Sequence, residues 1–254
     1  MPIKSSKKQF KKKRIHRKKN KKSTKKGFAG SEMVMYKSKG LMPYPPRYRT
    51  KFSASIFGYT NGAISSGQYY LNQNVIKLPF ANGGFPNALP AIAGLNPTGF
   101  TTLYNSNYYT GYRVFATTIR VAFEPQALTD SVEVCVTPSR LTNVPTNTSV
   151  AMTQPHTKNM IFSSSKSNSG SKQNVISSTI TLHKFLGVRK EAIEDDLSGQ
   201  YTGLQGADPV KPLYWVINWQ TPDAVNLAVN LEYRISITYY AELFAPNQAE
   251  MVQT

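Results

Sequence analysis

Apolar and polar residues alternate with a period of two over much of the chain, most clearly near its C-terminal end. One set of alternating positions there is apolar: Leu231, Tyr233, Ile235, Ile237, Tyr239, Ala241 and Leu243. Polar or charged residues occupy most positions between them: Glu232, Arg234, Ser236, Thr238 and Glu242. Because successive side chains of a β-strand point to opposite faces, the pattern predicts one long strand with an apolar face on a core and a polar outer face.

Shorter segments of the same kind precede this strand. Alternation or a continuous apolar run predicts strands at 51–56, 119–124, 131–136, 176–182 and 213–219. Segments rich in Gly, Asn, Pro and Ser predict loops at 58–68, 81–99, 139–159, 163–174 and 198–212. One helical candidate, Arg189–Leu197, is long enough for a turn or two. Many short strands and long connections predict an all-β fold, an antiparallel sandwich or jelly roll in a single domain.

Positive charge is concentrated at the N-terminal end of the chain. The 254 residues contain 31 Lys and Arg against 13 Asp and Glu, a formal charge of +18. Residues 1–26 hold fourteen of these bases and no acid, and residues 27–51 add five bases and one acid. Residues 52–254 hold twelve of each sign, so their formal charge is zero. Such asymmetry indicates that the N-terminal segment binds nucleic acid or an anionic membrane surface.

We predict three parts: a disordered arm at 1–26, an extended linker at 27–50 and a folded domain at 51–254. Like charges repel along the arm, and its apolar residues are too few to offset the entropy lost on ordering. The linker ends in Pro43-Tyr44-Pro45-Pro46-Arg47, where the prolines favour extended backbone. A fully extended arm spans about 90 Å, so it can reach far from the domain.

The cationic side chains of the arm are the candidate nucleic-acid-binding residues: Lys4, Lys7, Lys8, Lys11, Lys12, Lys13, Arg14, Arg17, Lys18, Lys19, Lys21, Lys22, Lys25 and Lys26. Flexible lysines neutralise phosphates without geometric demands, so we expect binding that is independent of sequence and weakens with salt. At about −0.7 per phosphate contact on a single strand, the logarithmic salt slope is at most about −10. A solvating tail is one alternative. A nuclear import signal, which Lys11–Arg14 would suit, is compatible with nucleic-acid binding.

The sequence contains none of the common catalytic or metal-binding motifs, and we predict neither an enzyme nor a cofactor. His16, His156 and His183 have no zinc-binding spacing with one another or with Cys135. A nucleophile elbow, a Walker A loop and a dinucleotide-binding glycine motif are absent from the sequence. The carboxylates of 191–196 (Glu191, Glu194, Asp195 and Asp196) do not match a calcium loop, so we interpret them as a solvated charged turn.

Cysteine and aromatic residues add expectations about packing. The one cysteine excludes an internal disulfide and fits a reducing compartment, and we expect Cys135 to be a packed or interface thiol. Apolar runs stay shorter than the roughly 20 residues of a membrane span. Each of three tyrosine pairs should place one ring in the core: Tyr69-Tyr70, Tyr108-Tyr109 and Tyr239-Tyr240. We expect most aromatic rings to pack in the core or at interfaces instead of stacking on bases.

Several short motifs follow the arm along the chain. They are Pro45–Phe52, Tyr112–Val114 continuing to Ile119–Pro125, His183–Val188, Pro212–Ile217 and Ile237–Leu243. Together with the arm they resemble the capsid proteins of circovirus-like viruses, which are small, circular, Rep-encoding single-stranded DNA viruses. The arm differs from that family in being rich in Lys, with only Arg14 and Arg17, where circovirus arms are rich in Arg.

The resemblance implies an eight-stranded antiparallel jelly roll, with roughly sixty copies forming a T=1 icosahedral shell whose arms face a packaged single-stranded DNA genome. Implied partners are that DNA, other copies of the chain, nuclear import receptors and a cell-surface attachment factor, without membrane insertion. The implied location is the virion and, during assembly, the host nucleus. Two alternatives stay open: the capsid of a small RNA virus, and a cellular β-sandwich protein with a basic or aromatic nucleic-acid-binding face.

Overall fold

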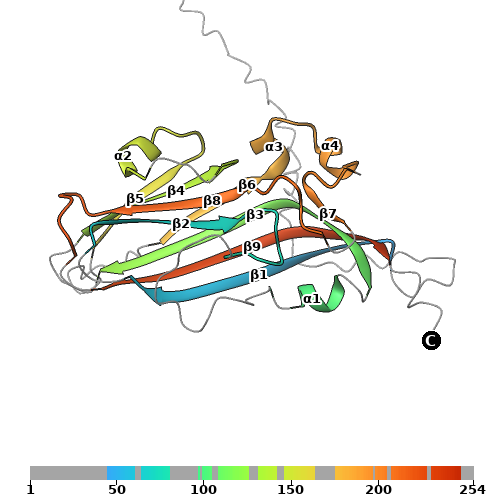
Figure 1. The fold of residues 1–254 in the computed structure, drawn as a ribbon, viewed down its shortest axis with the longest axis horizontal. Helices are drawn as coiled ribbons and strands as arrows, with labels where there is room; N and C mark the ends of the chain where they lie inside the picture. The colour runs from blue at the N-terminus through green and yellow to red at the C-terminus, as the bar shows by residue number, and fades with distance from the viewer. Residues whose placement is uncertain are drawn as a thin grey trace, which may run out of the picture. The chain divides into compact units, whose positions relative to one another are not determined.

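Two antiparallel β-sheets form the layers of a sandwich in the computed structural model (Figure 1). The structure describes residues 45–60, 64–80, 97, 99–104, 108–125, 131–141, 146–163, 175–196, 198–204, 207–227 and 230–246. Its strands are β1 (Arg47–Tyr59), β2 (Ser66–Asn72), β3 (Tyr109–Pro125), β4 (Ser131–Ser139), β5 (Lys158–Ser163), β6 (Val175–Thr181), β7 (Thr202–Leu204), β8 (Tyr214–Gln220) and β9 (Leu231–Pro246). Its helices are one or two turns long: α1 (Phe100–Leu103), α2 (Thr148–Ala151), α3 (Leu182–Leu186) and α4 (Lys190–Glu194).

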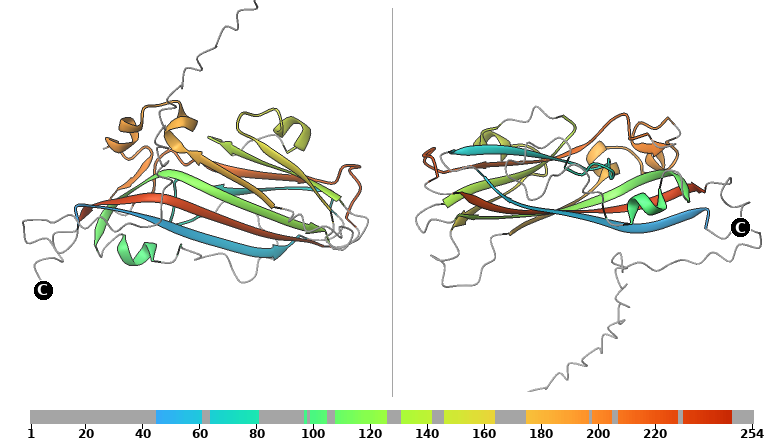
Figure 2. Two further views of the ribbon diagram at one scale, coloured as in Figure 1. Left: turned by 180° about the vertical axis from the view of Figure 1, so that it is seen from behind. Right: turned by 60° about the horizontal axis from the view of Figure 1, so that its bottom comes forward.

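The strand order is that of a jelly roll. One sheet has the order β1-β9-β3-β6, with the short β7 also paired to β3, and the other has the order β2-β8-β4-β5. If β7 is left aside, the first strand pairs with the eighth, the second with the seventh, the third with the sixth and the fourth with the fifth, all antiparallel. This nested pairing is a long hairpin rolled into two sheets, which confirms the predicted eight-stranded jelly roll. The rear view in Figure 2 shows β9 (red) between β1 (blue) and β3 (green).

Strand β9 supplies the central row of the core. All seven apolar residues of its alternating set are buried, as the sequence predicts. They lie opposite inward-facing residues of β1 and β3; Ile237, for example, pairs with both Ala54 and Ile119. Trp215 and Trp219 from β8 fill the space from the other sheet. The core is therefore one apolar layer shared by the two sheets.

Buried polar side chains in the core make specific hydrogen bonds. Trp215 donates its indole N–H to Thr117 Oγ1 at 2.9 Å and so links β8 to β3 across the sandwich. The hydroxyl of Tyr239 donates to the carbonyl oxygen of Asn72 at 2.7 Å and links β9 to the end of β2. Because an unpaired buried polar group would destabilise the fold, these two bonds favour one alignment of the sheets.

The structure corrects the expected element boundaries at several places, among them β7, which lies within the predicted loop 198–212. Strand β1 begins at Arg47, inside the range assigned to the linker, while β2 and β5 occupy parts of the predicted loops 58–68 and 139–159. Edge strands β2 and β5 each have one neighbour in their sheet, and four successive residues of β5 are exposed, so neither shows a clear period of two. The predicted loops 81–99 and 163–174 lie largely outside the described residues.

We predict that Ile237→Ala lowers the free energy of unfolding by about 2–5 kcal/mol, because it leaves a cavity in the shared core. The matched control is Thr238→Ala, one residue further along β9 on the outer face, where the hydroxyl contacts Ser53 Oγ at 3.0 Å. Its expected loss is about 1 kcal/mol or less. Urea denaturation of the unassembled protein measures both, and equal losses would contradict the assignment of the two faces.

Candidate nucleic-acid interface

The fourteen candidate nucleic-acid-binding residues of the arm lie outside the described residues, so their role stays a prediction. The structure does show how the basic sequence enters the folded domain. Arg47, Arg49 and Lys51 occupy alternate positions of β1, and all three are exposed on the outer face of its sheet. Basic charge therefore continues from the linker onto the sheet surface.

A buried ion pair lies under this entry point. Glu242 of β9 is 1% exposed and Arg113 of β3 is 4% exposed, and Arg113 Nε lies 3.0 Å from Glu242 Oε2. The exposed Arg49 donates its Nε–H to the other carboxylate oxygen at 2.9 Å. The alternation along β9 predicts that Glu242 lies on the polar outer face, and the register agrees. The implied prediction that Glu242 is exposed to solvent is wrong, because other parts of the chain cover its carboxylate.

Helix α4 and two aromatic rings surround the ion pair. Arg113 donates from Nη1 to the backbone carbonyl of Glu194, and its guanidinium stacks over the ring of Phe244 at 4.4 Å. Lys190 Nζ lies 2.9 Å from the Glu194 carboxylate and 5.7 Å from the centre of the Phe115 ring. Burial lowers the pKa of Arg113 while Glu242 opposes that shift, and a guanidinium stays charged in proteins at neutral pH. The cluster thus fixes the start of β1 against β3, β9 and α4.

The acidic turn at 191–196 has a structural role. Burial alone would raise the pKa of Asp196, but hydrogen bonds from the Ser198 hydroxyl and from the backbone amides of Tyr201 and Gln200 lower it. The Lys190 ammonium lowers the pKa of Glu194 in the same turn. Within the described ranges, no group of three or more His, Cys, Asp or Glu side chains could hold a metal ion. Asp196 thus organises the chain between α4 and β7, whereas Glu194 forms ion pairs with Lys190 and Arg49.

Cys135 is a packed thiol, as predicted. Its side chain is buried beneath α2, and Sγ lies 3.7 Å from the carbonyl oxygen of Thr148. Burial, together with the nearby Glu133 carboxylate, raises the pKa of the thiol to about 12. The thiol therefore stays protonated near neutral pH and is a poor nucleophile.

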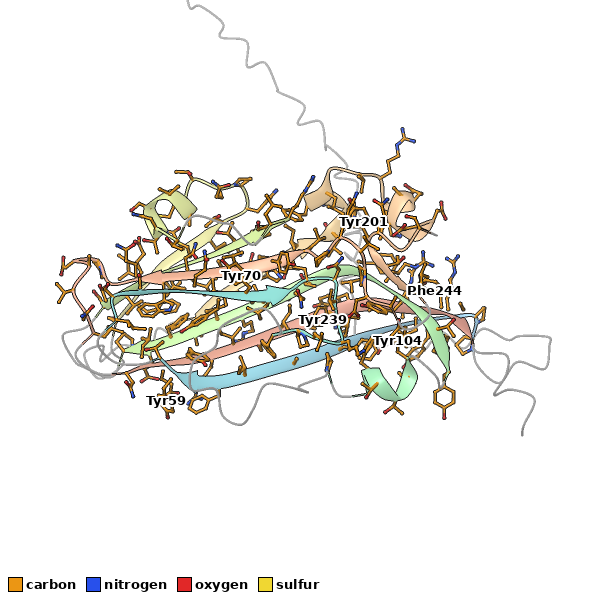
Figure 3. The ribbon with its side chains drawn as sticks, viewed as in Figure 1. Tyr59, Tyr70, Tyr104, Tyr201, Tyr239 and Phe244 are labelled. Carbon is orange, nitrogen blue, oxygen red and sulfur yellow. The ribbon has the colours of Figure 1, made fainter. Side chains whose placement is uncertain are left out.

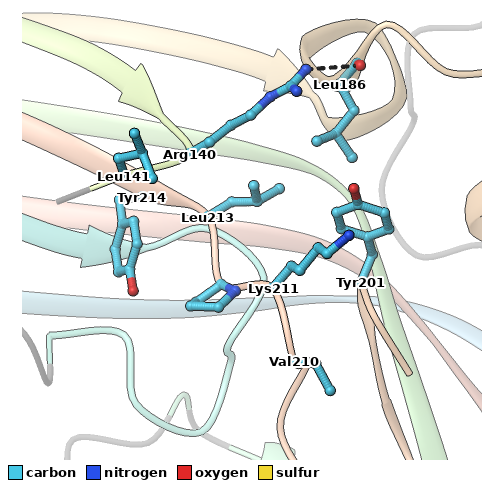
Figure 4. Close-up of a pocket in the computed structure, with 9 residues that line it drawn as sticks. Arg140, Leu141, Leu186, Tyr201, Val210, Lys211, Leu213 and Tyr214 are labelled. Carbon is cyan, nitrogen blue, oxygen red and sulfur yellow. Dashed lines mark hydrogen bonds between the residues drawn. The ribbon is translucent and has the colours of Figure 1, made fainter. Parts of the chain in front are cut away.

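A pocket of about 400 Å³ lies beside the start of β8 and has two basic lining residues, Arg140 and Lys211 (Figure 4). Arg140 donates from Nη2 to the carbonyl oxygen of Leu186 at 2.8 Å and so stabilises the C-terminal end of α3. Lys211 Nζ lies 5.8 Å from the centre of the Tyr201 ring. Arg140 therefore has a structural role at the end of α3.

The tyrosine pairs divide as predicted. The core holds Tyr69, Tyr109 and Tyr239, while their neighbours Tyr70, Tyr108 and Tyr240 are partly exposed. Figure 3 shows Tyr239 inside the sandwich, with Tyr59 on the side of β1 away from β2. In the part of the chain that the structure describes, no helix has the length and apolar character of a membrane span.

Sequence reasoning missed the Arg113–Glu242 pair. Arg113 occurs in a motif of the resemblance, but nothing in that motif shows that the side chain is buried. The two residues are 129 positions apart, and they meet because β3 and β9 pair in one register. No signal in the sequence separates Arg113 and Glu242 from other charged residues of the same strands, such as Arg120 and Glu232, which are not buried.

The chain was compared with known proteins both by sequence and by structure. No protein-family model and no curated protein matches the sequence. Among solved structures, the chain is similar to that of Desmodium yellow mottle tymovirus, with a TM-score of 0.44 and 10% identity over 86% of this chain and 94% of that one. It is also similar to tobacco necrosis virus, with a TM-score of 0.40 and 15% identity over 80% and 99%. The decameric BFDV capsid protein gives a TM-score of 0.41 and 10% identity over 78% and 99%. These similarities are distant, and the jelly-roll assignment rests on the strand order itself.

We predict that Arg113→Ala lowers the free energy of unfolding by about 3–5 kcal/mol, because it removes the buried partner of Glu242. Arg49→Ala is the control, since the Arg49 side chain is 59% exposed and its ion pair should contribute about 1 kcal/mol or less. The double variant Arg113→Met with Glu242→Leu should recover most of the loss, because neither charge remains buried. Denaturant melts measure all three, and no recovery in the double variant would contradict this account.

Measurement of the free energy of unfolding as a function of pH tests the role of Asp196. Its lowered pKa means that the charged carboxylate stabilises the fold above the unfolded-state pKa of about 3.8, and that this contribution is lost as the pH falls through the lower folded-state value. Asp196→Asn should cost about 1 kcal/mol at pH 7, and the difference from wild type should shrink below pH 3.8. The matched control for the loss of one carboxylate is the exposed Asp223→Asn, which should cost less than Asp196→Asn at pH 7 because it lies outside this turn.

Proposed function

We propose that the protein is a viral capsid subunit that assembles with copies of itself into a small icosahedral shell and packages single-stranded DNA through its basic arm. The observation that carries the proposal is the division of charge along the chain. Fourteen bases without an acid precede a jelly-roll domain whose formal charge from residue 52 onward is zero. Arm and domain are therefore suited to different partners.

A domain with equal numbers of basic and acidic residues suits contact between identical copies. Large net charge on each subunit would oppose assembly by Coulomb repulsion, and twelve bases against twelve acids avoid it. The described surface also exposes large apolar side chains that suit burial between copies: Ile161 (62%), Leu141 (63%), Val225 (65%) and Val210 (71%). They are distributed over several elements, as contacts with more than one neighbour in a closed shell require.

A concentrated lysine arm suits a phosphate backbone of any sequence. Its binding energy comes mainly from counterion release, which demands many charges and little geometry. The choice of single-stranded DNA follows the resemblance to circovirus-like capsid proteins. A small RNA virus capsid is the second candidate, because the Lys-rich arm departs from the Arg-rich arms of circovirus-like capsid proteins.

Neutralising the arm tests the packaging role. We predict that replacing all fourteen arm bases by Gln abolishes nucleic-acid packaging and removes up to about 10 from the magnitude of the logarithmic salt slope of binding. A chain whose residues 1–26 are shuffled keeps the charge and should bind as the wild type does. Fluorescence anisotropy with an oligothymidylate gives the slopes, and loss of binding in the shuffled arm would contradict sequence-independent recognition.

Particle formation tests the shell role. Light scattering and negative-stain microscopy of the wild-type chain should show closed particles, and nucleic acid extracted from them should be sensitive to DNase. Sensitivity to RNase alone would favour the RNA-virus alternative. A chain that stays monomeric or forms only small oligomers under every assembly condition would overturn the proposed function.

A further inference from the structure

The outer face of the β1-β9-β3-β6 sheet carries a continuous band of hydroxyl groups. Side chains at matching register positions form rows across the four strands, and the central row is Ser53, Thr238, Thr118 and Thr179. The next row is Ser55, Ser236, Arg120 and Ser177. On the other side of the central row, Lys51 pairs with Tyr240. We call these three rows, completed by Ala116 and Thr181, the hydroxyl face; Figure 2 shows the strands in this order.

Eight of the twelve residues of the hydroxyl face are Ser or Thr, and none is acidic. Its two cations, Lys51 and Arg120, are exposed, and neither forms an ion pair with a carboxylate of the described residues. Lys51 Nζ lies 5.2 Å from the centre of the Tyr240 ring. From strand and residue spacings, the Cα atoms of Lys51 and Arg120 are about 16 Å apart, with the central hydroxyl row between them.

We propose that the hydroxyl face is a second nucleic-acid-binding site, which holds the sugar-phosphate backbone of a packaged single strand against the folded domain. Ser, Thr, Lys and Arg side chains are the usual partners of phosphate and sugar oxygens, and they hold a strand without reading its sequence. Tyr240, beside Lys51, offers a ring on which an unpaired base can stack. The face has the chemistry of a backbone platform and no carboxylate to repel phosphate.

The position of the face relative to the arm supports this occupant. Strand β1 follows the linker directly, and its first outward residues, Arg47 and Arg49, continue the basic sequence to Lys51 at the edge of the hydroxyl face. The chain therefore enters the folded domain at the edge of the hydroxyl face. The identity of the ligand rests on the proposed function, whereas the binding site itself can be tested on unassembled protein.

The experiment uses the full-length chain with its fourteen arm bases changed to Gln, so that binding by the folded domain is measured alone. In this background, Lys51→Gln with Arg120→Gln removes both cations of the hydroxyl face. The matched control is Lys77→Gln with Lys211→Gln, which removes the same charge at exposed positions elsewhere on the domain. The four domain side chains replaced in the two pairs are exposed, and circular dichroism should show an unchanged fold in both variants.

We expect the arm-neutralised chain to retain weak, salt-dependent binding to oligothymidylate by fluorescence anisotropy. The hydroxyl-face pair should weaken it about tenfold at 0.15 M salt and reduce the magnitude of the salt slope by about 1.4, while the control pair changes it less than twofold. Equal effects of the two pairs, or no binding by the arm-neutralised chain, would overturn the inference and leave packaging by the arm intact. Failure of the wild-type chain to assemble would instead count against the proposed function.

A second readout uses wild-type particles. Oligonucleotides containing 5-bromodeoxyuridine are packaged and irradiated, and cross-linked peptides are identified by mass spectrometry. Cross-links at Tyr240 in β9 are expected. Cross-links confined to residues 1–26, or protection of Tyr240 by a neighbouring subunit, would assign the face to another role.

Discussion

The apolar row of β9 is the constraint on which the rest of the structure depends. Seven side chains at alternate positions must lie in the core, and a shift of one residue would turn all of them outward. Because β9 pairs with β1 on one side and with β3 on the other, its register fixes the alignment of all three strands. The same register fixes the outer face, where Glu242 meets Arg113 and Thr238 lies between Ser53 and Thr118. The alternation of apolar and polar residues along β9 thus determines both the packing of the core and the chemistry of the outer face.

The sequence predicts those parts of the fold in which burial on one face is strong. The alternating strands at β3, β4, β6 and β9 are predicted because each has a buried row, and the apolar run of β8 is predicted because both of its faces are covered. Edge strands β2 and β5 escape prediction because one neighbour and partial exposure impose little pattern. The period of two places Glu242 on the correct face, but its burial depends on Phe244 and α4, whose positions are tertiary facts.

Counting charges along the sequence gives the net charge of a whole segment, but it does not give the charge of a folded surface. The zero formal charge of residues 52–254 disfavours a basic face on the domain, yet counting cannot say which charges are already paired. The structure shows that Glu133 accepts a hydrogen bond from Thr148, Asp196 holds a turn, Glu232 pairs with Arg234 and Glu242 is buried. Lys51 and Arg120 have no such ionic partner among the described residues. Because Lys51 lies just before this segment and Arg120 within it, the domain can present a basic patch although residues 52–254 are neutral in total.

The arm and the hydroxyl face would bind nucleic acid with different affinities, and the reason is physical. An arm with fourteen bases gains affinity by releasing many counterions, whereas two cations on the hydroxyl face give only weak binding when they act alone. Once the arm has captured a strand, however, the face meets that strand at the high effective concentration that a covalent connection imposes. Weak sites are then occupied without any increase in their intrinsic affinity. On this argument, the start of β1 at Arg47 is functionally important because it connects the linker, and through the linker the arm, to the edge strand of the sheet that presents the second site.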